Sequence, residues 1–448
     1  MKVVQTTSWY FPESSGGVEV YLDGLIQGLT SRQIENIVAA PKNGDKPDDY
    51  QYNGVEVYRY PLHPSPSLAQ QREQSPPGGF EDFCQWLETQ NADLYHQHSW
   101  RFGCGLHHLR YARQLGLPTV VTIHMPEVVC LRGTMMLNGS SPCDGRIDPL
   151  RCGYCYGVPE RIPAWAISGL SQVPQGLSRG AETQLLGSKN VRMRQLGRTL
   201  SIPTQVTVHA HKLQEMAQLA DRIVAVCQWL EDALRLNGVP KDKIVLSRHG
   251  VSYACSSSPR QKQPDEPLKI GFLGRWQETK GVQVLAEAVC QLPKNIPVQL
   301  MIYAVSQGEL SRVNEAKVFA MAETDSRIQI NKKLSRDQVP EAMKGFDLLA
   351  VPSQWLETGP LVVLEAFATQ TPVLGSNRGG IAELVEHGVD GWLVEADHVE
   401  AWKTAIAQLA TDPELLSKLR QGIKPVRTMD DVAQDMTQLY EEILRTSS

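Results

Sequence analysis

Strand-like and helix-like segments alternate along most of this 448-residue chain. Val3–Thr6 is a short apolar run typical of a buried strand, and residues 18–30 follow it with apolar side chains at a helical spacing. The same order returns in the second half, where Lys269–Leu273 precedes a helical pattern over Gly281–Gln291. Because a helix after each strand lets neighbouring strands run parallel, the alternation predicts an α/β fold with largely parallel sheets.

A segment without apolar periodicity divides this alternation into two halves. Residues 256–267 read SSSPRQKQPDEP, a mixture of serine, proline and charge that is typical of a linker. We therefore expect an N-terminal Rossmann-like domain over residues 1–255 and a C-terminal Rossmann-like domain over residues 268–425. A last helix, over residues 426–448, is expected to cross back to the N-terminal domain. Two such domains predict a cleft between them, since ligands bind at the carboxyl ends of parallel strands.

Composition limits the classes of protein to which the chain can belong. Apolar residues make up 42% and charged residues 21%, which is ordinary for a soluble globular protein. No apolar run approaches the roughly 20 residues that span a bilayer, and the first residues are expected to form a strand rather than a signal peptide. We therefore expect a cytoplasmic location, with a peripheral membrane contact left open. The net charge of −5 gives no indication of nucleic-acid binding.

Two glutamates eight positions apart mark the most informative stretch of the second half. Glu357 and Glu365 flank Thr-Gly-Pro, a sequence that can open a helix. A spacing of eight does not make helical neighbours, so we expect Glu357 in a loop at a strand end and Glu365 one to two turns into the next helix. Pro360 is expected at the first helical position, where the free amides around it suit an anion. This arrangement fits a phosphate-bearing substrate with hydroxyls at both ends, such as a nucleotide-sugar.

Cations and glycines occupy other strand-to-helix turns. Arg275 and Lys280 lie between a predicted strand and a predicted helix, where two fixed cations suit a diphosphate. Taken singly, each is more readily a solvated surface cation, but their shared place at a strand-to-helix turn, in the same domain as the glutamate pair, favours the diphosphate. Gly379-Gly380 and Gly16-Gly17 are glycine-rich turns of the same kind, and each by itself is an ordinary turn.

The order of these motifs resembles the family-four retaining glycosyltransferases, which have the GT-B fold of two Rossmann-like domains facing across a cleft. The resemblance covers nearly the whole chain. It rests on Gly16-Gly17, His124 at the end of a strand, Gly274-Arg275 with Lys280-Gly281, the Glu357 and Glu365 pair, and the segment GGIAELVEHGVDGWLV.

Two segments depart from the family pattern. Met125 follows His124 where the family often has an acidic residue, which weakens the sugar contacts expected around that histidine. His249-Gly250-Val251-Ser252 stands where the family often has Asn-Gly-Val-Asp, and its role is left open. For His124 the plain alternative is a core histidine with satisfied hydrogen bonds.

The resemblance implies a retaining hexosyltransferase that needs no catalytic metal. Its donor would be a UDP- or GDP-sugar, and its acceptor a glycan, a glycolipid or a small hydroxylated molecule. His124 and Glu357 would be the catalytic residues beside the transferred sugar. The implied donor-binding residues are Gly17, Arg275, Lys280, Gly359, Leu361 and Glu365, the last on the ribose. The alternatives are a nucleotide-sugar epimerase or a phosphorylase of the same fold, or a non-catalytic glycan-binding protein.

Four cysteines lie within 26 residues of an insertion expected over residues 125–200 of the N-terminal domain. Their spacing, C-x12-C-x8-C-x2-C, fits a tetrahedral four-sulfur site, for which a structural zinc ion is the first candidate. An iron–sulfur cluster, disulfides and free thiols remain alternatives. A subset of the family has a similar cysteine-rich loop after the same histidine. The four are Cys130, Cys143, Cys152 and Cys155.

The insertion is also basic, because its arginines and lysines outnumber its acids. The plain interpretation is a solvated surface. The sharper one is a surface for an anionic lipid-linked or polymeric acceptor.

Overall fold

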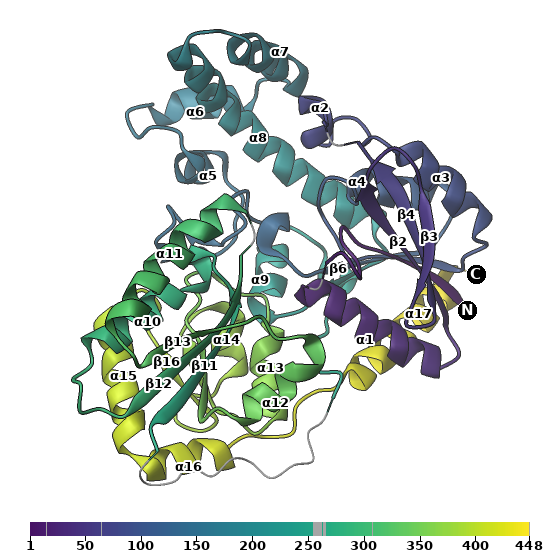
Figure 1. The fold of residues 1–448 in the computed structure, drawn as a ribbon. Helices are drawn as coiled ribbons and strands as arrows, with labels where there is room; N and C mark the ends of the chain where they lie inside the picture. Colours follow the sequence, from purple (N-terminus) through teal and green to yellow (C-terminus); the bar gives the residue numbers. More distant parts are fainter. Residues whose placement is uncertain (15, 64, 254–261, 263–265, 307, 448) are drawn as a thin grey trace. The chain divides into compact units, whose positions relative to one another are not determined.

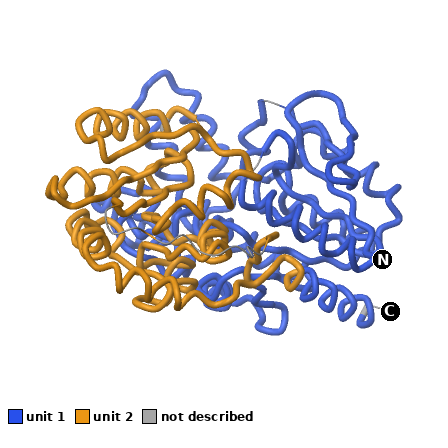
Figure 2. The backbone as a smooth tube through the Cα atoms, turned by 60° about the horizontal axis from the view of Figure 1, so that its bottom comes forward, with its two compact units in different colours: residues 1–247, 433–448 blue, residues 248–432 orange. Residues whose placement is uncertain are grey.

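The computed structural model describes the chain except for residues 15, 64, 254–261, 263–265, 307 and 448, and except for the side chains of residues 310 and 447. The described residues form two compact units, which Figure 2 colours separately. Unit 1 contains residues 1–247 and 433–448, and unit 2 contains residues 248–432. Most of the expected linker, residues 256–267, lies outside the described residues.

Unit 1 is built on an eight-stranded sheet in the order β10-β9-β6-β5-β1-β2-β4-β3. The strands run parallel except for the edge pair β3 and β4. Its central strands are apolar and buried on both faces, as in β1, where Val3 and Val4 are fully covered. The strands are β1 (Lys2–Thr6), β2 (Glu35–Asn43), β3 (Asp48–Tyr52), β4 (Val55–Leu62), β5 (Leu94–Gln97), β6 (Thr119–Ile123), β9 (Arg222–Ala225) and β10 (Ile244–Leu246).

Helices connect these strands and cover the sheet (Figure 1). The last one, α17, ends the chain beside the sheet of unit 1, where Tyr440 Oη lies 2.6 Å from His96 Nδ1. The helices are α1 (Gly17–Ser31), α2 (Leu68–Gln71), α3 (Phe80–Thr89), α4 (Leu106–Gln114), α9 (Gln228–Leu236) and α17 (Met429–Ser447), with the 3₁₀ turns η1 (Pro126–Val128) and η2 (Lys241–Lys243).

The insertion of unit 1 is more helical than its glycine and proline content suggests. A small hairpin, β7 (Met136–Leu137) with β8 (Ser141–Pro142), precedes α5 (Pro149–Tyr156), α6 (Ala164–Ser171), α7 (Gln175–Leu186) and α8 (Val191–Leu219). The 29-residue α8 continues through Pro203, a residue that usually interrupts a helix. The helices α5, α6 and α7 all pack on α8 (Figure 1), so tertiary packing compensates for the hydrogen bond that Pro203 cannot donate.

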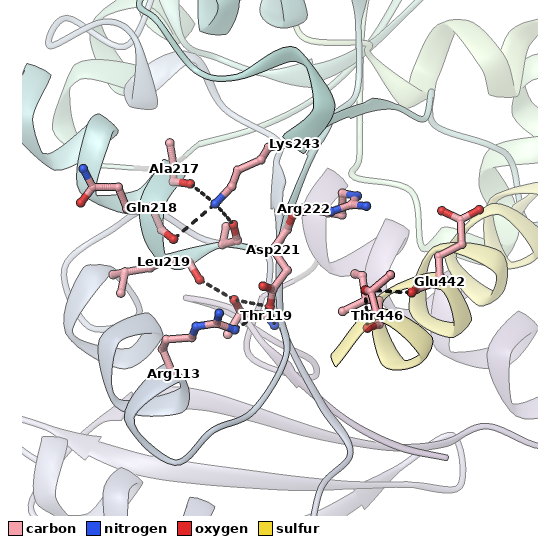
Figure 3. Close-up of polar contacts among 12 residues, drawn as sticks. Arg113, Thr119, Ala217, Gln218, Leu219, Asp221, Arg222, Lys243, Glu442 and Thr446 are labelled. Atoms are coloured by element: carbon pink, nitrogen blue, oxygen red, sulfur yellow. Dashed lines mark hydrogen bonds and ion pairs between the residues drawn. The ribbon is translucent and has the colours of Figure 1, made fainter. Parts of the chain in front are cut away.

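The carboxyl end of α8 is fastened to the sheet by charged side chains (Figure 3). Lys243 Nζ donates to the carbonyls of Ala217 at 2.7 Å and Ala220 at 2.9 Å, which have no partner within the helix. Asp221 Oδ2 accepts from the Thr119 amide and from Arg113 Nη1, both at 2.8 Å. These contacts fix the amino ends of β6 and β9 and thereby the direction in which both strands point.

Unit 2 is built on a six-stranded parallel sheet in the order β13-β12-β11-β14-β15-β16. One face packs on a large apolar cluster that includes the buried Trp276 and Trp402, and the other on a smaller one around Phe346 and Val363. The strands are β11 (Leu268–Arg275), β12 (Val298–Val305), β13 (Ile328–Asn331), β14 (Leu348–Val351), β15 (Val373–Ser376) and β16 (Gly391–Val394).

Helices lie on both faces of this sheet, as expected for a doubly wound unit. They are α10 (Val282–Gln291), α11 (Glu309–Thr324), α12 (Val339–Lys344), α13 (Leu361–Ala368), α14 (Gly379–Leu384), α15 (Val399–Thr411) and α16 (Pro413–Gln421), with the turns η3 (Glu278–Lys280) and η4 (Arg336–Gln338). None of the helices in the described part of the chain combines the length and the apolar character needed to cross a bilayer.

Candidate functional site

The strand order of unit 2 reverses between β11 and β14. The chain passes from β11 to β12 and β13 on one side and then returns to place β14 on the other side of β11. Loops at the carboxyl ends of two such strands diverge and leave a crevice, which is the usual ligand site of an open parallel sheet. Arg275 ends β11, and the loop that follows β14 carries Glu357. Residues predicted from sequence therefore lie at this reversal point.

Glu357 is the centre of a buried polar network. Its carboxylate is 7% exposed, and Oε1 accepts from Lys280 Nζ at 2.6 Å. The same oxygen accepts from Ser353 Oγ at 2.7 Å and Trp355 Nε1 at 2.8 Å. The Lys280 ammonium also lies 5.3 Å from the centre of the Trp355 ring, within the range of a cation–π contact. Sequence analysis found Glu357 and Lys280 but neither their pairing nor Ser353 and Trp355.

The network keeps Glu357 ionised despite its burial. Burial, the largest influence, raises the pKa of the carboxyl group, whereas the Lys280 charge and the three hydrogen bonds lower it. The net effect is a pKa below the usual value. Glu357 is therefore a fixed acceptor that can bind hydroxyl groups, and it does not have the raised pKa that suits a general acid.

Glycines allow this loop to pack against its neighbours. A Cβ on Gly281, whose φ is +72°, would lie 1.8 Å from the Pro352 carbonyl oxygen. A Cβ on Gly380 would lie 2.6 Å from the Gly359 nitrogen, and the Gly380 amide donates to the Glu357 carbonyl at 2.7 Å. The glycine turn at the start of α14 thus supports the backbone that carries Glu357.

The amides of Gly359 and Leu361 lie where the loop enters α13. The helix begins at Leu361 with Pro360 as its N-cap, so the expectation that Pro360 is the first helical residue is wrong by one position. Pro360 has an extended ψ of 119°, which directs the chain into the helix without joining it. The Gly359 carbonyl is bonded at 2.8 Å to Nδ1 of the buried His249, a contact between residues 110 positions apart that no sequence pattern signals.

Glu365 and Arg275 complete the set of predicted residues in unit 2. Glu365 is the fifth residue of α13, and burial raises the pKa of its carboxyl group, with the Arg336 charge opposing this. Arg275 is partly buried at the end of β11, and within the described residues its guanidinium makes no ion pair. Arg275 lies at the end of a strand, before the turn into the next helix. A cation at such a position that makes no ion pair with the described residues is suited to an anionic ligand.

His124, the predicted catalytic residue of unit 1, follows β6 and ends a row of buried imidazoles. Its Nε2 lies 3.1 Å from His98 Nδ1, and the His98 ring lies 4.0 Å from the His96 ring. Tyr21 on α1 covers His124 with an edge-on contact of 4.7 Å between ring centres. Burial lowers the pKa of His96 to about 3 and holds that of His98 well below its usual value, so both rings are neutral near pH 7.

The hydrogen bonds around His98 fix which atom of His124 donates. Gln5 Nε2 donates to Asn36 Oδ1, so Gln5 Oε1 accepts from His98 Nε2 at 2.9 Å. Nδ1 of the neutral His98 is then an acceptor, and His124 Nε2–H donates to it. His124 is therefore held by the core through Nε2.

Gly17 is the first residue of α1, after the N-cap Gly16. Gly16 has an ordinary extended backbone, with φ −84° and ψ −178°, so no left-handed conformation requires a glycine there. As glycines, Gly16 and Gly17 add no side chain of their own at the amino end of α1, where free amides can bind an anion.

The four clustered cysteines are free thiols. Burial raises the pKa of the thiols of Cys143 and Cys152. Backbone amides point at two of the sulfurs, from Asp148 to Cys152 at 3.5 Å and from Asn138 to Cys155 at 3.2 Å. Across the described residues, no group of three or more His, Cys, Asp or Glu side chains is arranged to hold a metal ion.

Comparison with known proteins agrees with this architecture. Residues 16–153 match the family described as glycosyl transferase 4-like domain, and residues 256–425 match the family described as glycosyl transferases group 1. Each match covers less than half of the chain. The first lies in unit 1, and the second covers the Glu357 network of unit 2.

Solved structures of glycosyltransferases cover the chain from end to end. Sucrose-phosphate synthase from Thermosynechococcus elongatus has a TM-score of 0.66 at 18% identity, with 99% of each chain covered. HepE from Anabaena, solved in complex with UDP-glucose, has a TM-score of 0.60 at 14% identity, with 100% of this chain and 99% of HepE covered. The predicted α/β fold of the GT-B type is confirmed.

Curated relatives match a shorter part of the chain. D-inositol 3-phosphate glycosyltransferase of Rhodococcus jostii is 32% identical over 221 residues, which cover 46% of this chain and 48% of that protein. The protein of the same name from Xylanimonas cellulosilytica is 28% identical over 248 residues, covering 51% and 58%. The chain thus spans about half the length of the curated relatives it matches.

Proposed function

We propose that this protein transfers a hexosyl group from a nucleotide-diphospho-sugar to a hydroxyl group of an acceptor, with retention of the anomeric configuration. The observation that carries this proposal is the buried Lys280–Glu357 pair at the reversal point of the unit 2 sheet. Arg275, which makes no ion pair with the described residues, ends a strand at the same point. The pair supplies a fixed acceptor for sugar hydroxyls. Arg275 supplies charge for a diphosphate, and Glu365 supplies an acceptor for a ribose.

In this proposal the protein acts by positioning and by charge. Arg275, with the amides of Gly359 and Leu361, stabilises the charge that develops on the departing diphosphate. Glu357 binds the sugar hydroxyls, and its lowered pKa keeps it an acceptor throughout. From unit 1, Gly17 allows α1 to approach a phosphate, and His124 contacts the transferred sugar. No side chain is assigned as a nucleophile, and no catalytic metal is required.

The donor and the reaction can be tested together. The UDP-glucose bound by HepE makes UDP-glucose the first donor to test, against GDP- and ADP-glucose, in a thermal-shift experiment. Glu365→Ala is expected to weaken nucleotide binding more than about tenfold in calorimetry, because a ribose would lose a bidentate acceptor. Glu323→Ala, an exposed glutamate of α11, is the matched control. Equal affinity in wild type and Glu365→Ala would refute the ribose assignment.

The stereochemistry and the metal requirement have their own tests. We expect the first product observed by proton NMR to keep the donor's anomeric configuration, and the rate to be unchanged by EDTA. D-inositol 3-phosphate, the acceptor in the relatives' name, is the first soluble acceptor to test. Epimerase, phosphorylase and glycan-binding alternatives have no supporting observation.

We further propose that Cys130, Cys143, Cys152 and Cys155 bind one structural zinc ion, around which their side chains would have to converge from the arrangement described above. Amides directed at the sulfurs of Cys152 and Cys155 support this, because such N–H groups stabilise thiolate ligands. Four thiolates would close the coordination sphere, so the ion would fasten the loop rather than catalyse. Protein purified without added zinc is expected to contain about one equivalent by metal analysis. An absence of metal together with four titratable thiols would contradict this.

We propose that the protein is cytoplasmic and makes a peripheral membrane contact, which the helical insertion supports. Residues 161–200 contain six cations and one acid, Glu182, which is buried in an ion pair with Arg72. Large apolar side chains are exposed in the same segment: Trp165 at 78%, Leu177 at 69%, Val191 at 65%, Leu196 at 45% and Met193 at 39%. Cations beside exposed apolar side chains are typical of a surface that binds anionic lipid.

Vesicle binding tests this contact. The protein should sediment with phosphatidylglycerol vesicles and not with phosphatidylcholine vesicles. The double variant Trp165→Ser, Leu177→Ser is expected to bind at least about tenfold more weakly, since each side chain contributes roughly 1.5 kcal/mol when buried. Leu236→Ser, at a 38% exposed position of α9, is the control. Wild-type protein that fails to sediment with anionic vesicles would disprove the contact.

A further inference from the structure

The sheet of unit 1 also has a reversal point, and a pocket lies at it. The strands β2, β4 and β3 lie in this spatial order on one side of β1. The strands β5, β6, β9 and β10, which come later in the chain, lie on the other side of β1. The pocket has a volume of about 320 Å³, and it is lined by residues that follow β1 and β5 and by residues of β2 and β4. Its size is at the lower end of small-ligand sites, which span about 300–1,000 Å³.

An exposed tryptophan stands at this pocket. Trp9 is 51% exposed, whereas the next two residues, Tyr10 and Phe11, are 0% and 6% exposed. Phe11 stacks on Tyr52 with ring centres 4.8 Å apart, and Tyr10 belongs to the same apolar cluster. The loop is therefore anchored directly after its exposed residue. An indole that could bury a large apolar area is instead presented to solvent beside Phe102, which also lines the pocket.

Fixed polar groups surround the indole. Arg59 is 1% exposed, and its Nη2 donates to Glu13 Oε2 at 2.5 Å and to the Pro41 carbonyl at 2.9 Å. This buried guanidinium holds the half-exposed carboxylate of Glu13 in place. Lys42 Nζ lies 4.0 Å from Glu13 Oε1, so a donor and an acceptor are held side by side at the pocket.

The charges of the pocket are largely compensated. Lys42 is paired with Asp48 at 2.7 Å, Arg59 with Glu13, and Arg101 with Glu127 through Nε at 2.8 Å. A phosphate or carboxylate would have to displace these partners. A neutral ligand with an apolar face and a rim of hydroxyl groups would instead use both the aromatic surface and the alternating donors and acceptors.

We propose that this pocket is a saccharide subsite that binds one pyranose unit, with the apolar face of the ring on Trp9 and its hydroxyl groups on Glu13 and Lys42. On the proposed function, on which this assignment of role rests, the unit belongs to the acceptor glycan. The subsite lies at the carboxyl edge of unit 1, and the donor-binding residues proposed for unit 2 make no part of it.

Binding can be tested without any donor or membrane. Saturation-transfer NMR on the full chain would use methyl α-glucopyranoside, methyl α-mannopyranoside, methyl β-galactopyranoside, maltose and cellobiose. The control is myo-inositol, a hydroxylated ring that is not a pyranose. We expect at least one pyranoside to give a saturable signal that is strongest for protons of one ring face. Trp9→Ala should abolish the signal, and Glu13→Gln should weaken it at least about fivefold, because a charged acceptor is lost. Tyr156→Ala, another exposed aromatic residue of unit 1, should leave it unchanged.

The outcomes separate the subsite from the proposed reaction. No signal from any of the pyranosides, or a signal that survives Trp9→Ala, would overturn the subsite. A signal as strong from myo-inositol would also overturn the pyranose assignment. With an active acceptor, Trp9→Ala should raise the acceptor KM and leave the hydrolysis of UDP-glucose unchanged. If UDP-glucose fails to bind the wild type while the saccharide signal depends on Trp9, the proposed transfer fails and the subsite stands.

Discussion

The carboxyl edges of the two sheets hold their polar residues in opposite ways. In unit 2, Glu357 is ionised and is held by one cation and several hydrogen-bond donors. In unit 1, His96, His98 and His124 form a row of buried imidazoles, two of which are neutral because burial lowers the pKa of His96 and His98. The Glu357 network is fixed by charge pairing, whereas the histidine row is fixed by hydrogen bonds that include two neutral rings, although ion pairs such as Arg59–Glu13 also lie at the carboxyl edge of unit 1.

This difference indicates a division of labour. A fixed carboxylate next to cations suits a donor that carries a diphosphate and many hydroxyl groups. The charge on the diphosphate of such a donor changes during the reaction. Neutral imidazoles and an exposed indole suit an uncharged ring that must be oriented without being held tightly. The difference also predicts that the two units respond differently to acid, to charge removal and to added volume.

Acid should destabilise unit 1 most. Burial lowers the pKa of His96 and His108 to about 3 and of His209 to about 4, whereas the unfolded value is about 6.5. Between pH 6.5 and about 4 the unfolded chain therefore binds more protons, and stability falls as pH falls. At about pH 5 each histidine lowers the free energy of unfolding by about 2 kcal/mol, so the three lower it by about 6 kcal/mol.

The free energy of unfolding of unit 2 should fall less on acidification. His249 is its one described histidine with a lowered pKa, of about 4. Calorimetry at pH 7.5 and at about pH 5 measures both losses. His108→Phe gives the control, since His108 lies among Phe80, Phe83 and Tyr60 and its Nε2 has no partner among the described residues. The variant should lose about 2 kcal/mol less on acidification. An equal loss of unfolding free energy in the two units would contradict the expectation that acid destabilises unit 1 more than unit 2.

Charge removal should affect unit 2 most. Lys280→Ala leaves the carboxylate of Glu357 buried without its cation, which is expected to lower the free energy of unfolding by about 3 kcal/mol. Urea unfolding measures the change. The double variant Lys280→Ala, Glu357→Gln should recover part of the loss, because no unpaired charge remains. A single variant as stable as the wild type would show that the pair does not hold this loop.

The fold was predictable because it depends on local periodicity, and most of the site was not because it depends on distant contacts. Alternating patterns located β1, α1, β11 and α10 within a few residues. The glycines and prolines of the insertion conceal the length of α8, which is stabilised by the packing of α5, α6 and α7. The edge strand β3 has no apolar pattern of its own and forms by pairing with β4.

Within the site, sequence supplied the charged residues but not their partners. Glu357 and Lys280 were each predicted for the donor, yet the bond between them joins residues 77 positions apart. Ser353 and Trp355 stand four and two residues before Glu357. In a loop, unlike in a helix or a strand, such spacings do not predict which side chains are in contact. His249 was noted only as a departure from a family pattern, and its bond to Gly359 became visible in the structure. The roles of these residues remain predictions.

Added volume should have the smallest effect, and it should again be specific to unit 2. Gly380→Ala places a methyl group 2.6 Å from the Gly359 nitrogen and 2.8 Å from the Glu357 carbonyl oxygen, both backbone atoms that cannot rotate away. We expect a loss of about 1–3 kcal/mol in the free energy of unfolding and a larger proportional loss of nucleotide affinity, because the displaced segment carries Glu357 and the Gly359 amide. Urea unfolding and calorimetric titration with UDP measure the two effects. Gly169→Ala in α6, where the added Cβ would meet no atom within 4 Å, is the matched control and should raise helix stability slightly. If both alanine variants bind UDP as the wild type does, the glycine turn has no role in positioning the loop, and the tight packing of this edge is unrelated to ligand binding.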